Sequence, residues 1–118
     1  MGQLLKIYIG ERDHFRGEPL YHAIVIRARQ MGLAGATVYR GLEGFGAHSR
    51  IHTANILRLS EDLPVIIEIV DSPERIAGFI PALDEMVREG VVFTVDNVKI
   101  LKYQKAPRGT NPSGTRST

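Results

Sequence analysis

The chain contains no cysteine among its 118 residues. It therefore has no disulfide framework, thiol nucleophile or thiolate metal site, and thiol redox chemistry and zinc ribbons are excluded. It also lacks any uninterrupted apolar run of the roughly 18 residues that a membrane-spanning helix needs. The start, MGQLLK, has neither the basic segment nor the long apolar stretch of a signal peptide. We expect a cytoplasmic protein that does not insert into the membrane.

Basic residues are in little excess, since 15 Lys and Arg stand against 13 Asp and Glu. Three of the basic residues, Lys105, Arg108 and Arg116, lie in a C-terminal segment without acids, so the rest of the chain is close to neutral. Nucleic-acid binding depends on cations clustered on a folded face, which this composition does not provide. Nucleic acid is therefore not an expected partner.

Hydrophobic periodicity predicts four strands and two helices in the order strand, helix, strand, strand, helix, strand. The strands are expected at 4–9, 35–41, 63–70 and 91–103, and the helices at 18–31 and 72–89. Pro81 lies inside the second helix, where its missing N–H predicts a kink or a fresh start. Asp96 and Asn97 predict a bulge in the last strand.

Two strand-helix-strand halves of this kind pack most simply as an α+β, ferredoxin-like βαββαβ fold, a four-stranded antiparallel sheet with two helices on one face. We expect one domain over residues 1–104, because 43% hydrophobic residues suffice for a single globular core. Residues 105–118 contain no large apolar side chain and are rich in Pro, Gly, Ser and Thr, which predicts a disordered tail.

Residues 40–46, with the sequence RGLEGFG, contain three glycines and lead into a long segment of no settled periodicity. Glycine lets backbone N–H groups approach an anion without a Cβ in the way, and Arg40, Arg50 and Arg58 supply up to three cations nearby. A phosphate-bearing ligand is therefore one interpretation. The alternative is that the glycines only shape the exit from a strand, since no standard nucleotide-binding motif is present.

Other residues offer less specific chemistry. His48 and His52 are four positions apart, but no third ligand is evident, so no metal site is expected. Glu11, Asp13 and His14 supply carboxylates and an imidazole for acid-base catalysis, although nothing in the sequence fixes their geometry. A small enzyme using these three is kept as an alternative, and no catalytic residue is assigned.

Two segments, GLAGATVYRGLEGFG at 32–46 and LPVIIEIV at 63–70, resemble the PII-like signalling proteins. Together with KIYIGE, GEPLYHAIV, SRIHTANILRL and VKILKY, they resemble the family catalogued as domain of unknown function 190 over almost all of 4–103. The resemblance implies a ferredoxin-like homotrimer that binds an adenine nucleotide in clefts between subunits and acts in signal transduction.

The resemblance and the nearby cations together define a set of candidate ligand-binding residues. These are Thr37, Tyr39, Arg40, Gly41, Gly44, Phe45, Gly46 and Arg50. The loop at 47–59 corresponds to the loop through which PII proteins engage partners, which suggests a membrane transporter or channel as partner. The resemblance implies neither a catalytic residue nor a bound metal in this chain.

This sequence departs from the PII pattern after the second helix. PII proteins carry a glycine- and lysine-containing phosphate loop there, whereas residues 87–90 pass directly into Val91. AMP or ADP is therefore expected in preference to ATP. A structural trimer that binds no ligand is the remaining alternative.

Overall fold

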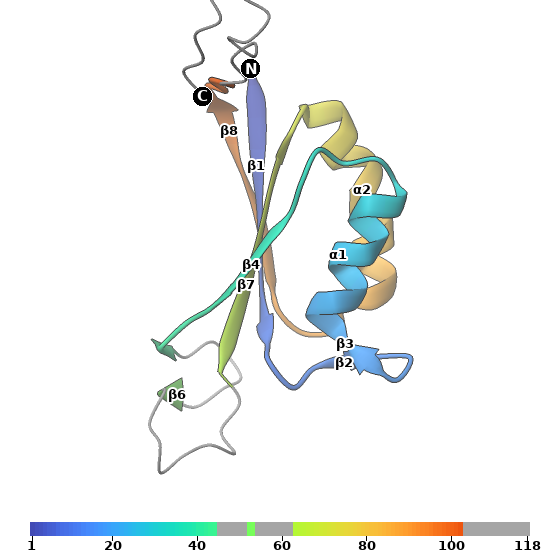
Figure 1. The fold of residues 1–118 in the computed structure, drawn as a ribbon, viewed down its shortest axis with the longest axis vertical. Helices are drawn as coiled ribbons and strands as arrows, with labels where there is room; N and C mark the ends of the chain where they lie inside the picture. The colour runs from blue at the N-terminus through green and yellow to red at the C-terminus, as the bar shows by residue number, and fades with distance from the viewer. Residues whose placement is uncertain (45–51, 54–62, 103–118) are drawn as a thin grey trace, which may run out of the picture.

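The computed structural model of the chain describes residues 1–44, 52–53 and 63–102. The main body is a four-stranded antiparallel sheet in the order β4-β7-β1-β8, with both helices on one face (Figure 1). Its strands are β1 (Gly2–Gly10), β4 (Thr37–Arg40), β7 (Pro64–Asp71) and β8 (Val91–Val98), and its helices are α1 (Leu20–Gln30) and α2 (Pro73–Met86). This arrangement confirms the predicted α+β, ferredoxin-like fold.

Alternation along the strands divides the side chains between two faces of the sheet. Leu5 and Ile7 of β1 and Ile67 and Ile69 of β7 are 0–1% exposed and face the helices. The helices complete this core with buried residues at helical spacing, namely Leu20, Ile24, Ala28, Ile76, Phe79, Leu83 and Met86. The intervening strand residues lie on the opposite side, which no described element covers and which we call the open sheet face (Figure 1).

Helix α2 begins as the sequence predicts. Ser72 is its N-cap, and the Ser72 Oγ accepts a hydrogen bond of 3.2 Å from the backbone N–H of Arg75. Contrary to one expectation, the helix does not begin again at Pro81 but continues to Met86 as one element. Buried Phe79 and Leu83 lie on either side of the proline, and their burial stabilises the helix across the missing hydrogen bond.

The predicted bulge in the last strand is confirmed. Gly2 pairs with Val98 and Leu4 pairs with Val95, so two residues of β8, Asp96 and Asn97, face one residue of β1. Asn97 adopts a φ of 60°, which asparagine tolerates better than most residues. The strand ends at Val98 rather than at 103, because Val98 pairs with Gly2, the first residue of β1, and β1 offers no further partner.

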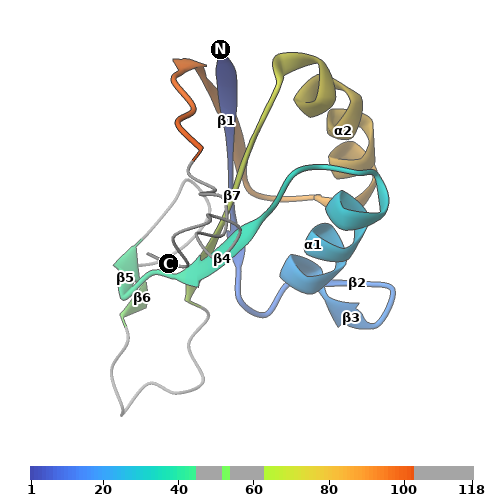
Figure 2. The same cartoon turned by 45° about the horizontal axis from the view of Figure 1, so that its top comes forward.

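Two short hairpins were not predicted. Strands β2 (His14–Phe15) and β3 (Glu18–Pro19) pair across a turn in which Arg16 and Gly17 both have positive φ. Strands β5 (Glu43–Gly44) and β6 (His52–Thr53) pair beside the end of β4 (Figure 2). Strands of two residues are too short to produce a periodic pattern, so the sequence did not indicate them. Glu18 and Pro19 were predicted as the start of the first helix, which begins at Leu20 instead.

In the described part of the chain, neither helix is long and apolar enough to cross a membrane. Residues 105–118 lie outside the described residues, so the predicted tail and the domain boundary at 104 stay predictions.

Candidate functional site

The glycine-rich segment begins where β4 ends against Pro64. The backbone N–H of Gly41 donates a 2.8 Å hydrogen bond to the carbonyl oxygen of Pro64. A Cβ on Gly41 would lie only 2.8 Å from Pro64 Cγ, whereas a Cβ on Gly44 would lie 3.4 Å from the same atom. Gly41 is therefore required by close packing, while Gly44 has room for a methyl group.

Strand β4 places its alternate side chains on the open sheet face. Thr37 and Tyr39 pair in register with Glu68 and Ile66 of β7. The Tyr39 hydroxyl donates a 2.7 Å hydrogen bond to Glu68 Oε2, and the Lys6 ammonium lies 3.3 Å from the same oxygen. We call Lys6, Tyr39 and Glu68 the sheet-face triad. It was not predicted, but the alternation of strands at 4–9, 35–41 and 63–70 puts these residue types on one face.

The triad changes the protonation behaviour of its members. The hydrogen bond from Tyr39, and then Lys6, lower the pKa of Glu68, so its carboxylate is charged at neutral pH. The same hydrogen bond to Glu68 raises the pKa of Tyr39, which keeps the phenol protonated as a donor. Tyr8, followed by Glu68 and Tyr39, raises the pKa of the Lys6 ammonium. The triad is thus a neutral set with one cation and one anion.

Arg40 is held at the same end of β4 as the glycines. Its guanidinium lies 3.0 Å from the carboxylate of Glu11, and the backbone N–H of Glu11 donates a 2.8 Å hydrogen bond to the carbonyl of Leu63. The Arg40 side chain is nevertheless 58% exposed, so it keeps donors available to solvent or a ligand.

Five of the eight candidate residues lie along β4 and the segment that follows it, but Thr37 and Tyr39 are on the open sheet face, whereas Arg40 pairs in register with the core residue Val65 and so lies on the other side of the strand. Thr37 stands at the start of β4 and Tyr39 and Arg40 at its end, with Gly41 and Gly44 next to Pro64. Phe45, Gly46 and Arg50 lie outside the described residues, as do His48 and most of the loop at 47–59, so their roles stay predictions.

The alternative acid-base loop does not converge on one point. Glu11 is paired with Arg40, whereas Asp13 Oδ2 accepts a 3.0 Å hydrogen bond from the backbone N–H of Gly10. His14 Nδ1 lies 2.6 Å from the carbonyl oxygen of Arg12. Each group has its own structural partner. Among residues 1–44 and 63–102, no three His, Asp or Glu side chains gather as a metal-binding set.

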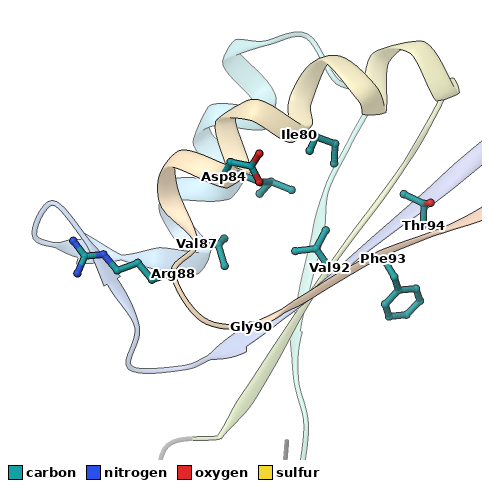
Figure 3. Close-up of a pocket in the computed structure, with 9 residues that line it drawn as sticks. Ile80, Asp84, Val87, Arg88, Gly90, Val92, Phe93 and Thr94 are labelled. Atoms are coloured by element: carbon teal, nitrogen blue, oxygen red, sulfur yellow. The ribbon is translucent and has the colours of Figure 1, made fainter. Parts of the chain in front are cut away.

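Sequence reasoning missed a hollow between α2 and β8 (Figure 3). It has a volume of about 470 Å³, with Ile80, Leu83 and Val87 on the helix side and Asp84 and Arg88 among its lining residues. Val92 is directed toward α2 and Phe93 to the other side of the strand. The alternation of β8 was visible in the sequence, but its place at the edge of the described sheet was not.

The family profile DUF190, described as Uncharacterized ACR, matches residues 2–100. The chain belongs to the DUF190 family. A UPF0166 protein of Methanocaldococcus jannaschii is 38% identical over 100 residues, which cover 85% of this chain and 92% of that protein. A UPF0166 protein of Aquifex aeolicus is 32% identical over 99 residues, covering 84% of this chain and 92% of the relative. The resemblance inferred from the sequence is confirmed.

Solved structures place this DUF190 chain in the PII-like fold. CPII from Thiomonas intermedia K12, a nitrogen regulatory PII-like protein, superposes with a TM-score of 0.55 at 19% sequence identity. The match covers 80% of this chain and 83% of CPII. One of the CPII structures is bound to ADP and bicarbonate, and another to ADP, AMP and bicarbonate. At this identity the likeness establishes the fold of the DUF190 chain.

Proposed function

We propose that this DUF190 protein is a PII-like regulatory protein, not an enzyme, that binds an adenine nucleotide beside β4 and signals through the loop at 47–59. The observation that carries the proposal is the end of β4, where Gly41 and Gly44 lie against Pro64 and the neighbouring Arg40 keeps an exposed guanidinium. The exposed guanidinium of Arg40 suits a phosphate group. CPII, which shares the fold, has been solved with ADP and AMP.

The short connection between α2 and β8 bears on which nucleotide fits. Only four residues, 87–90, join Met86 to Val91, and Arg88 is the one basic residue among them. Each further phosphate group adds negative charge, and this connection offers one cation to neutralise it. The proposal is therefore AMP or ADP in preference to ATP, with no metal required.

The proposed assembly is a homotrimer with the ligand between subunits. The open sheet face exposes apolar side chains that a second copy would cover, among them Val91 at 57% and Val95 at 43% exposure.

A regulatory role requires that the nucleotide bind one state of the loop more tightly than another, since a ligand with equal affinity for both states does not change their populations. A membrane transporter or channel is the proposed partner of the cytoplasmic trimer.

Isothermal titration with AMP, ADP, ATP and cyclic AMP tests the proposal. We expect saturable binding of AMP or ADP that Thr37→Ala weakens and that Gln30→Ala, on the far side of α1, leaves unchanged. Analysis of the titrated mixture for product distinguishes a regulatory protein from a small enzyme, because only an enzyme converts the nucleotide. Absence of heat with all four nucleotides would contradict the proposal and favour a structural trimer.

A further inference from the structure

Arg40 stands at the end of an apolar row on the helix side of the sheet. It pairs in register with Val65 of β7, and Val65 pairs in turn with Ile9 of β1. Val65 and Ile9 are buried in the core, whereas the Arg40 side chain is 58% exposed on β4, an edge strand of the described sheet. The row therefore ends in a cation that a ligand can reach from solvent.

The carboxylate beside this cation comes from a different part of the chain. Glu11 directly follows β1, and its Oε2 lies 3.0 Å from Nη2 of Arg40. Strand β7 lies between β1 and β4, so the ion pair crosses over β7. The Glu11 side chain is itself 32% exposed. An anion that approaches Arg40 from solvent therefore also approaches the negative charge of Glu11.

The turn after β1 holds Glu11 in place without using its carboxylate. The backbone N–H of Glu11 donates a 2.8 Å hydrogen bond to the carbonyl oxygen of Leu63. Asp13 closes the turn, because its Oδ2 accepts a 3.0 Å hydrogen bond from the backbone N–H of Gly10 and its carbonyl oxygen accepts one of 2.7 Å from Leu20. An exposed ion pair contributes little to folding stability. The charge of Glu11 can therefore be removed while the turn keeps its hydrogen bonds.

We propose that Glu11 is a specificity-determining residue, whose carboxylate limits how much negative charge a nucleotide can bring to Arg40. The inference rests on the proposed function, in which the Arg40 guanidinium binds a phosphate group. A guanidinium has five N–H donors, so it can bond to one phosphate group while it stays paired with Glu11. Each further phosphate charge is repelled by the Glu11 carboxylate, and the pair supplies no second cation to offset that repulsion. Glu11 thus favours AMP over ADP and ADP over ATP.

A role for Glu11 in charge discrimination differs measurably from a role in orienting Arg40. An arginine that loses its orienting partner must be immobilised by the ligand instead, which weakens the binding of every phosphate-bearing ligand alike. Loss of a repelling carboxylate strengthens binding, and it does so most for the ligand with the most negative charge. The two roles therefore predict changes of opposite sign when the charge of Glu11 is removed.

Isothermal titration of the full chain with AMP, ADP and ATP, at low salt and without divalent cations, tests this inference. Glu11→Gln keeps the shape of the side chain, and we expect it to lower the dissociation constant for ATP by about threefold more than that for AMP. Glu11→Asp retains the charge and should retain the preference for AMP. The matched control is Glu85→Gln, which removes the same charge from a pair with Arg27 between the two helices. The control should bind all three nucleotides like the unsubstituted chain.

Circular dichroism establishes whether each variant is folded. Should Glu11→Gln fail to fold, the salt dependence of the unsubstituted chain decides, because added salt screens the repulsion and should lower the ratio of the ATP to the AMP dissociation constant. A folded Glu11→Gln variant that binds all three nucleotides equally more weakly, or as the unsubstituted chain does, would overturn the role of Glu11 but leave nucleotide binding intact. An unsubstituted chain that binds none of the three would instead contradict the proposed function, and with it the inference.

Discussion

Substituting Gly41 by alanine tests the packing that holds the base of the candidate site. The added Cβ would lie 2.8 Å from Pro64 Cγ, and the proline ring has little freedom to move aside because its carbonyl accepts a hydrogen bond from Gly41 itself. Overpacking of this kind costs about 1–3 kcal/mol. Gly44→Ala is the matched variant, since its Cβ would make an ordinary contact of 3.4 Å with the same ring atom.

Both substitutions reduce the conformational entropy of the unfolded chain by the same amount. This reduction by itself stabilises a protein by about 0.4–1 kcal/mol. The difference in the free energy of unfolding between the two variants therefore measures the clash alone, and we expect it to be about 2 kcal/mol. In a domain of this size that corresponds to a difference of about 10 °C in melting temperature. Thermal unfolding followed by circular dichroism at one protein concentration measures it. Equal melting temperatures for Gly41→Ala and Gly44→Ala would refute the close approach of β4 to Pro64.

Three further predictions concern the sheet, the second helix and pH. Ile67→Ala, at a fully buried position of β7, should lower the free energy of unfolding by about 2–5 kcal/mol in urea titrations. Ser72→Ala should cost about 1 kcal/mol by the same measurement, because it removes the N-cap of α2, and Ser72→Asp should restore most of the loss. Because the pKa of Glu68 is lowered in the folded state, its contribution to stability is complete at neutral pH and lost as the pH falls through that pKa; Glu68→Gln should flatten this part of the pH profile.

The fold followed from local patterns. Alternation placed Leu5, Ile7 and Ile9 on one side of the first strand, and all three are buried as that pattern requires. Ser72 and Pro73 marked the start of α2, and Asp96 with Asn97 marked the bulge, because these residues suit caps and irregular backbone. The fresh start predicted at Pro81 is wrong, because the cost of a proline at one backbone position was not weighed against the burial of Phe79 and Leu83 on either side of it.

The candidate site was only partly visible in the sequence. The glycines marked the end of β4, but the reason for Gly41 is the ring of Pro64, which lies more than twenty residues further along the chain. The sheet-face triad depends on the register among β1, β7 and β4. The hollow between α2 and β8 depends on the position of β8 at the edge of the described sheet. Such features arise from long-range pairing, which single residues do not encode.

Hydrogen-deuterium exchange with and without saturating ADP tests most directly whether this protein binds an adenine nucleotide beside β4. We expect slower exchange in peptides that cover residues 37–44, with α1 unchanged. Unchanged exchange throughout, or protection confined to α1, would show that no adenine nucleotide binds beside β4.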